Sequence, residues 1–162
     1  MSKTIVPLLD NTQAAFISQG VSINIATRDR FSMPTITRAL ACRVSPDQRQ
    51  VTLFLSAARA ARLLENIAHN GMIAVVFSQP STHRTLQLKG EDAHRVALQD
   101  DDYAIIPAST ASFVTELTAI GHGLGFSRTI VAHNDSLIAV KFTPGTIFDQ
   151  TPGPDAGRQL NR

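Results

Sequence analysis

Residues 51–80 read VTLFLSAARAARLLENIAHNGMIAVVFSQP, and the hydrophobic period changes twice within this stretch. The segment 51–55 is apolar and predicts a strand. From Ala57 to Asn70 the apolar residues recur on one helical face, which predicts an amphipathic helix, and the Asn-Gly pair at its end offers the left-handed residue that commonly terminates one. The unbroken apolar run 72–77 then predicts a strand that is covered on both faces.

Further strands are predicted on both sides of this segment. Residues 21–27 alternate apolar and polar side chains with the two-residue period of a half-buried strand, and the polar turn RDRFS follows. The strands predicted outside residues 51–80 are 21–27, 34–44, 84–96 and 137–148. A second helix is predicted over 109–120, and the GHGLGF stretch after it is interpreted as a loop that terminates this helix.

This order of elements predicts a mainly β fold with six or so strands and two or so helices. Short connections favour antiparallel pairing and disfavour the parallel βαβ arrangement of dinucleotide-binding folds. The expected architecture is a six-stranded antiparallel barrel, closed or partly closed. One domain is expected over residues 1–150, followed by an irregular tail over residues 151–162, because the tail is rich in proline, glycine and polar residues.

The composition is that of a folded protein without a nucleic-acid footprint. Apolar residues make up 43% of the chain and charged residues 17%, while the net charge is only +2. The single cysteine, Cys42, cannot form an intramolecular disulfide, which favours a reducing, cytoplasmic location. The opening residues MSKTIVPLLDNT lack the pattern of a signal peptide, and no apolar run of about 18 residues predicts a membrane span.

Arg59 is the most informative candidate for ligand binding. It lies in the first turn of the predicted helix, where free amide groups and the helix dipole already favour negative charge. A phosphate at that position would accept hydrogen bonds from the amides and from the forked guanidinium. The alternative is a solvated surface arginine, whose unfavourable dipole interaction amounts to roughly a few tenths of a kcal/mol.

Two further groups of polar residues are candidates for holding a cofactor. In RTLQLKG the side chains of Thr85, Gln87 and Lys89 share one strand face, where they offer donors and acceptors at fixed positions, although an ordinary solvent-facing strand explains them equally well. Arg38 lies in an apolar row and needs an anionic partner or the rim of the barrel. Arg43 lies on the opposite face of the same predicted strand. Both arginines can therefore contact one phosphate only if a bulge or bend interrupts the strand.

The sequence gives no support to a zinc site or to a hydrolase. The five histidines have no close ligand spacing, and a lone cysteine cannot form a thiolate site. No nucleophile motif of the G-x-S-x-G type is present.

Four stretches in this order resemble the FMN-binding split-barrel superfamily of pyridoxamine 5′-phosphate oxidase. They are SINIATRD, PTITRALACRV, residues 51–80 as quoted above, and RTLQLKG, with a looser match around 137–148. The resemblance implies a six-stranded split β-barrel that works as a homodimer and holds FMN in a cleft between its subunits.

The resemblance also implies roles for individual residues. The oxidase itself carries a flavin-contacting glutamine at the position of Thr85, so Gln87 or Lys89 is expected to make the contact with the flavin here. The cofactor-binding residues it implies are Arg38, Arg43 and Arg59 for the phosphate, and Thr85, Gln87 and Lys89 for the ring.

The chain departs from the true oxidase at its C-terminal end. The oxidase closes its site with a C-terminal tryptophan and arginine, whereas this chain has no tryptophan. Pyridoxamine phosphate oxidation is therefore not expected, and the match is to the short, diverse branch that includes flavin reductases and general-stress proteins. This branch implies an FMN-dependent oxidoreductase that acts on a small redox substrate. Three alternatives remain open. The chain could be a non-enzymatic flavin carrier or redox sensor, a haem-binding protein that uses His83 or His133, or a cofactor-free interaction domain.

Overall fold

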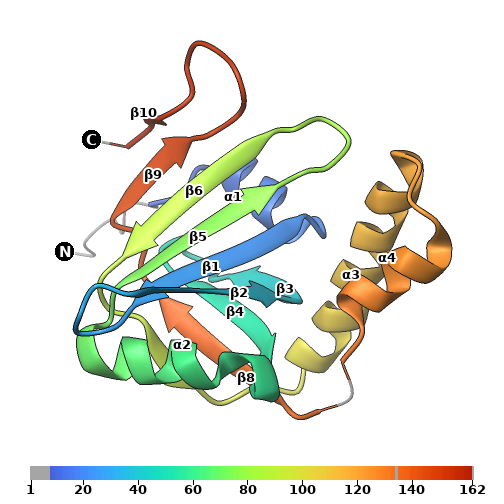
Figure 1. Cartoon of the computed structure of the whole chain (residues 1–162). Helices are drawn as coiled ribbons and strands as arrows, with labels where there is room; N and C mark the ends of the chain where they lie inside the picture. Colours follow the sequence, from blue (N-terminus) through green and yellow to red (C-terminus); the bar gives the residue numbers. More distant parts are fainter. Residues whose placement is uncertain (1–7, 134, 162) are drawn as a thin grey trace.

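The computed structural model describes residues 8–133 and 135–161, which form two antiparallel sheets flanked by four helices (Figure 1). The predicted domain and tail also include residues 1–7, 134 and 162, which lie outside the described ranges. No helix within these ranges combines the length and the apolar character that crossing a membrane requires.

The larger sheet has six strands in the order β10-β9-β6-β5-β1-β2, and every neighbouring pair is antiparallel. Its strands are β1 (Ser22–Arg28), β2 (Pro34–Ala39), β5 (Ile73–Ser78), β6 (Thr85–Gly90), β9 (Thr146–Asp149) and β10 (Arg158–Gln159). One face of this sheet packs on the core. The other face, which we call the outer face, carries mostly small or polar side chains over β1, β5 and β6, among them Ser22, Asn24, Ala26, Ala74, Val76, Ser78, Thr85 and Gln87.

The smaller sheet has the order β3-β4-β8-β7. Its strands are β3 (Ala41–Val44), β4 (Val51–Ser56), β7 (His94–Val96) and β8 (Leu137–Phe142). The chain passes from the larger sheet to the smaller one between β2 and β3, where the amide of Leu40 donates to the carbonyl of Phe54 at 2.8 Å. The predicted strand 34–44 is therefore two strands that serve two different sheets.

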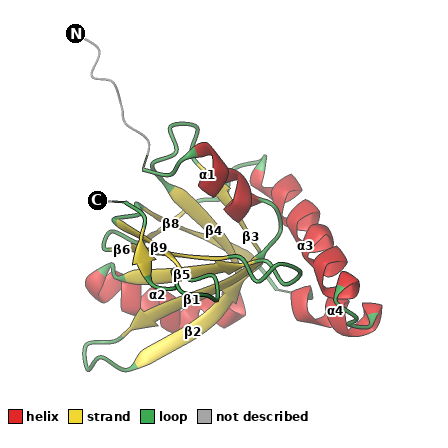
Figure 2. Cartoon of the chain, turned by 90° about the horizontal axis from the view of Figure 1, so that it is seen from above, coloured by secondary structure: helices red, strands yellow, loops and turns green. Residues whose placement is uncertain are grey.

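Four helices surround the sheets, namely α1 (Asn11–Ser18), α2 (Ala57–Asn70), α3 (Asp102–Ala119) and α4 (Leu124–Val131). Helix α2 packs against β1 and β2, and it ends at Gly71 with φ at 66°. Helices α3 and α4 form a hairpin at one side of the sheets, which we call the α3–α4 arm (residues 102–131; Figure 2).

The core lies between the two sheets and the helices α1 and α2. Strand β4 is buried along its whole length because sheet and helix cover it on both sides. The largest fully buried side chains are Phe16, Phe54, Phe77 and Phe142. A smaller cluster beneath the arm joins Leu40, Phe54, Ile106 and Ala139.

The predicted antiparallel β fold and the bounds of α2 are confirmed, and the structure corrects several other predictions. Helix α1 was not predicted, although Asp10 and Gln13 form a capping box at its start. Helix α3 begins seven residues before the predicted 109–120. GHGLGF is only partly a loop, because α4 begins at Leu124 within it. The predicted strands 84–96 and 137–148 are each divided in two by a turn.

Candidate functional site

Arg38 lies on the outer face of β2 next to the α3–α4 arm. Both terminal nitrogens of its guanidinium donate to Oγ of Ser22 at 3.1 Å, and its Cζ lies 4.9 Å from the ring centroid of Phe113 on α3. Burial lowers the pKa of Arg38, and the nearby positive charge of Arg59 lowers it further. Within the described part of the chain Arg38 has no carboxylate partner, so its charge is partly desolvated and not neutralised.

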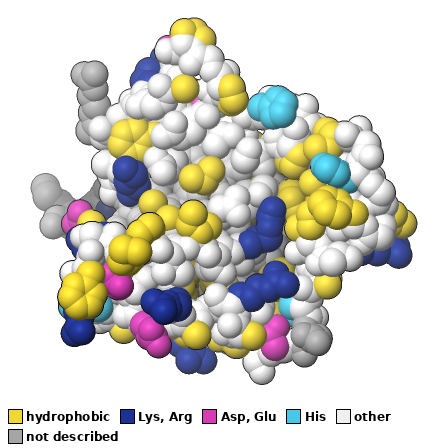
Figure 3. Space-filling model, viewed as in Figure 1, with side chains coloured by type: hydrophobic (Ala, Val, Ile, Leu, Met, Phe, Trp, Pro, Cys, Tyr) yellow, Lys and Arg dark blue, Asp and Glu magenta, His cyan; other side chains and the backbone are white. Residues whose placement is uncertain are grey.

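Arg59 lies beside Arg38 because the start of α2 packs against β2. The Thr37 hydroxyl donates to the carbonyl of Arg59 at 3.2 Å, and Nη2 of Arg59 lies 3.5 Å from the carbonyl of Ala132. No ion pair to Arg59 is formed in residues 8–133 and 135–161. Figure 3 shows Lys and Arg side chains gathered where the outer face meets the arm. Two adjacent cations without a carboxylate form a candidate anion site.

The sequence predicts a helix start that is free to bind an external anion, but in the structure a carboxylate of the chain itself occupies the start of α2. The amide of Ala58 donates to the Asp135 carboxylate at 2.8 Å, and the Ser56 hydroxyl donates to both oxygens of the same carboxylate at 2.8 Å. These hydrogen bonds, from Ala58 first and Ser56 second, lower the pKa of Asp135. The chain thus supplies its own anion to the helix dipole. The guanidinium groups of Arg38 and Arg59, and not the start of α2, remain as the candidate anion site.

Arg43 is not brought together with the other two arginines. Its Nε donates to Oδ1 of Asp102 at 2.8 Å and its Nη2 to Oδ2 at 3.4 Å, while Oδ2 also accepts from the amide of Gln99 at 2.8 Å. Asp102 is completely buried. The pair joins β3 to the first turn of α3, and the predicted role of Arg43 toward phosphate stays a prediction.

Thr85, Gln87 and Lys89 lie on the outer face of β6, while Leu86 and Leu88 point into the core. The Thr85 and Ser78 hydroxyls are hydrogen-bonded at 2.9 Å. Oε1 of Gln87 accepts from Nε2 of Gln150 at 3.2 Å. Nζ of Lys89 lies 5.1 Å from the ring centroid of Phe148. The first two side chains are therefore oriented by partners on neighbouring elements.

The register of the sheet places Gln87 and Arg38 in one row across the outer face. Gln87 pairs with Val76, Val76 with Asn24, and Asn24 with Arg38. Three strand spacings of about 4.8 Å give roughly 14 Å between the ends of the row. An elongated ligand with an anionic end and a polar ring fits this arrangement, with the anion at the arginines and the ring toward β6.

The histidines do not form a metal site in the described residues. No group of three or more His, Cys, Asp or Glu side chains comes close enough to hold an ion there. His83 is exposed in the β5–β6 turn with φ at 60°, and His133 is exposed after α4. The two candidate haem ligands thus belong to different loops.

No family model matches the sequence, and no curated protein matches it. Several solved structures match the fold. HupZ of Group A Streptococcus gives a TM-score of 0.57 at 15% identity, covering 93% of this chain and 100% of that one. A putative pyridoxamine 5′-phosphate oxidase from Lactobacillus delbrueckii gives 0.53 at 17% identity, with 91% and 97% covered. A protein titled F420 reductase gives 0.51 at 11% identity, with 86% and 98% covered. These TM-scores show a shared fold, and at identities this low the likeness extends to the fold alone.

Proposed function

We propose that this chain, whose fold is the split barrel of the pyridoxamine 5′-phosphate oxidase-like proteins, binds FMN on its outer face and serves as an oxidoreductase of small molecules. The observation that carries the proposal is the pair Arg38 and Arg59: the positive charge of Arg59 is near enough to lower the pKa of Arg38, and neither guanidinium has a carboxylate partner within the described residues. Arg38 is half-buried and Arg59 is exposed, and placing a second positive charge near a partly desolvated cation is unfavourable unless an anion binds to both.

The phosphate of FMN fits this pair. Each guanidinium offers a planar fork of donors, and two forks together match the charge of a phosphate dianion. The Ser22 hydroxyl, which now accepts from Arg38, keeps that side chain in place. Because Asp135 already binds the amide of Ala58, the arginines rather than the helix start provide the contacts.

The ring of the flavin fits the β6 end of the same row. Gln87 offers an amide donor and acceptor, and Thr85 offers a hydroxyl, both on a rigid strand. Val76 and Asn24 lie between the ends of the row, and neither side chain is large, which leaves room for a flat ligand. Bound FMN would supply reversible electron transfer. The protein residues would bind the phosphate, orient the ring and set its polar surroundings.

The proposal includes a homodimer with the cofactor between its subunits. Strand β2 is an edge of the larger sheet, and Ile36 on its outer face is 72% exposed. Phe31 and Met33 in the adjoining loop are exposed by 71% and 63%. Large apolar side chains gathered at a free sheet edge favour a protein partner, and a second copy would complete the cleft over the outer face.

The test is a titration of FMN into the purified, ligand-free protein. We expect the flavin fluorescence to be quenched with wild-type protein, and the Arg38→Gln variant to bind at least about tenfold more weakly, because a charged hydrogen bond contributes about 1.5–3 kcal/mol. Arg95→Gln removes an exposed cation on β7 and serves as the matched control. Equal affinities of Arg38→Gln and wild type would refute the site.

Separate measurements distinguish the related hypotheses. Oxidation of NADH or NADPH by the FMN-loaded protein identifies a reductase, whereas bound FMN without turnover identifies a carrier or sensor. Titrations with a deazaflavin and with haem in place of FMN test the other cofactor classes. Sedimentation of the loaded protein tests the homodimer.

A further inference from the structure

A cavity of about 600 Å³ opens at the end of the outer face that lies away from the arginine pair. Its floor is the row Ala26, Ala74, Lys89 and Thr146, which are directly paired across β1, β5, β6 and β9. The β8–β9 turn and the segment after β6 form its walls. This volume is within the usual range for small-molecule pockets, about 300–1,000 Å³.

The floor suits a flat, apolar ligand. Ala26 and Ala74 are adjacent on neighbouring strands, and neither side chain extends beyond its Cβ. Gly90 and Gly145 line the edge of the cavity without side chains. Met72 adds a flexible, polarisable wall, a side chain that contacts aromatic rings favourably.

The charged groups at the cavity favour a single negative charge on the ligand. Arg28 and Lys89 both line it, and neither forms an ion pair within the described ranges. Nη2 of Arg28 donates to Sδ of Met72 at 3.0 Å, and a thioether sulfur is a weak acceptor. Of the two acidic residues present, Asp92 accepts from the amide of Thr143 at 2.7 Å, and Glu91 is exposed in the same way as Arg28 and Lys89. With Asp92 hydrogen-bonded to the chain, two cations face one carboxylate, which leaves a net charge of +1 for a ligand.

We propose that this cavity binds a planar aromatic carboxylate, with the ring on the alanine floor and the carboxylate between Arg28 and Lys89. The site is distinct from the phosphate site at Arg38 and Arg59, and it goes beyond the binding of FMN. It lies two residues along the strands from the row of Gln87, so a ligand here would be a neighbour of a flavin bound on the same face.

The test uses flavin-free protein and naphthalene-2-carboxylate as the probe. Its binding is followed by calorimetry and by amide shifts in heteronuclear NMR spectra. We expect shifts concentrated at Ala26, Ala74, Gly90 and Gly145. Naphthalene-2-methanol, which lacks the charge, and hexanoate, which lacks the ring, are each expected to bind at least tenfold more weakly.

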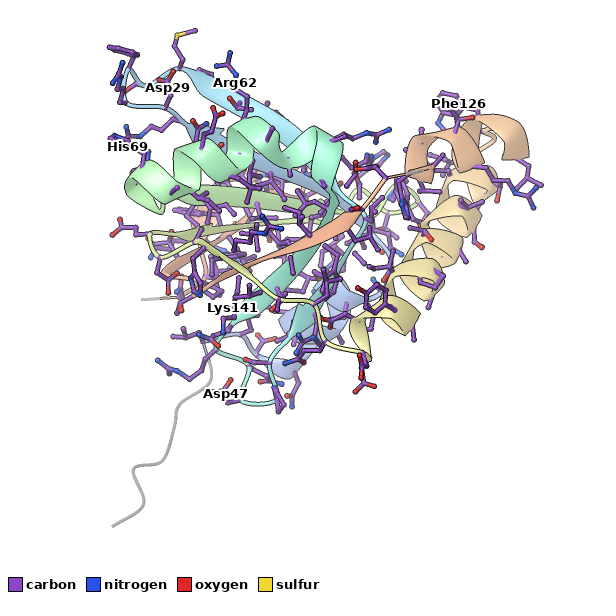
Figure 4. The ribbon with its side chains drawn as sticks, turned by 90° about the horizontal axis from the view of Figure 1, so that it is seen from below. Asp29, Asp47, Arg62, His69, Phe126 and Lys141 are labelled. Carbon is purple, nitrogen blue, oxygen red and sulfur yellow. The ribbon has the colours of Figure 1, made fainter. Side chains whose placement is uncertain are left out.

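Two variants with matched controls locate the site. Ala74→Leu fills the floor and Lys89→Gln removes one cation, and each is expected to weaken binding about tenfold or more. Ala68→Leu alters an exposed alanine of α2, and Lys141→Gln alters a lysine of β8 in the smaller sheet (Figure 4). Both controls should stay within twofold of wild type. If Ala74→Leu does not fold, Arg28→Gln replaces it as the second variant.

The outcome separates this proposal from that of FMN binding. Arg38→Gln should weaken FMN and leave the naphthoate unaffected, whereas Lys89→Gln should weaken the naphthoate in protein that has never bound flavin. Shifts centred on the exposed Leu124 and Phe126 of the arm, or equal losses in Lys89→Gln and Lys141→Gln, would overturn the cavity proposal and leave the flavin site untouched.

Discussion

Arg43 and Arg38 lie five residues apart on one stretch of chain, and the structure gives them opposite surroundings. Arg43 is paired with the fully buried carboxylate of Asp102 at 2.8 Å. Arg38 is half-buried near Arg59, with a hydroxyl and an aromatic ring as its contacts. The change of sheet at Leu40 separates the two side chains. A cation neutralised by the chain supports the fold, while a pair that lacks a counter-ion is available to a ligand.

The largest expected effect is on stability, at the neutralised arginine. Arg43→Met leaves Asp102 buried without its partner, and we expect the free energy of unfolding to fall by about 3 kcal/mol. Urea denaturation followed by circular dichroism measures it. Arg158→Met breaks the exposed pair with Asp155, at 3.8 Å, and should change stability by less than about 0.5 kcal/mol. FMN affinity should be unchanged in Arg43→Met at low temperature, where the protein remains folded. A loss of affinity there would show that Arg43 takes part in ligand binding as well as in stability.

The second prediction concerns the ligand-free pair. Arg59→Gln should weaken FMN binding about tenfold, or about 1.4 kcal/mol, with little loss of stability because Arg59 is exposed. The double variant with Arg38→Gln should lose less binding free energy for FMN than the sum of the two single losses, since both guanidinium groups contact the same phosphate. Arg62→Gln, on the same helix, is the control (Figure 4). Strictly additive losses would indicate that the two arginines bind separate groups.

The sequence predicted what depends on local pattern. The alternation of β1 and the helix that ends at Gly71 follow from spacing and from a residue that adopts positive φ. The carboxylate partners of Arg43 and of the amide of Ala58 lie far along the chain, since Asp102 is 59 residues from Arg43 and Asp135 is 77 residues from Ala58. No short-range pattern marks such contacts. The sequence therefore predicted the arginines as candidates, without showing which of them the fold neutralises.

The third prediction concerns the carboxylate that caps α2. Asp135→Asn should lower the thermal midpoint by about 2–4 °C, the shift typical of one lost helix cap in a domain of this size. Because hydrogen bonds from Ala58 and Ser56 lower the pKa of Asp135, its contribution is complete above the unfolded pKa of about 3.9 and is lost as pH falls through the folded pKa. The difference in thermal midpoint between Asp135→Asn and wild type should thus be constant from about pH 5 to 8 and disappear in stronger acid. A gap that persists there would contradict this assignment.

The smallest expected effect is at the far end of the row that begins at Arg38. Gln87→Leu removes a neutral hydrogen-bonding group, so FMN affinity should fall by only about three- to fivefold, near 1 kcal/mol, compared with tenfold or more for each arginine. Gln159→Leu changes an exposed glutamine on edge strand β10 and should have no effect. The flavin absorption band should also shift in Gln87→Leu and remain unchanged in Arg38→Gln, because only Gln87 lies where the ring is expected. A spectral shift in Arg38→Gln alone would place the ring at the arginines and reverse the orientation of the ligand on the outer face.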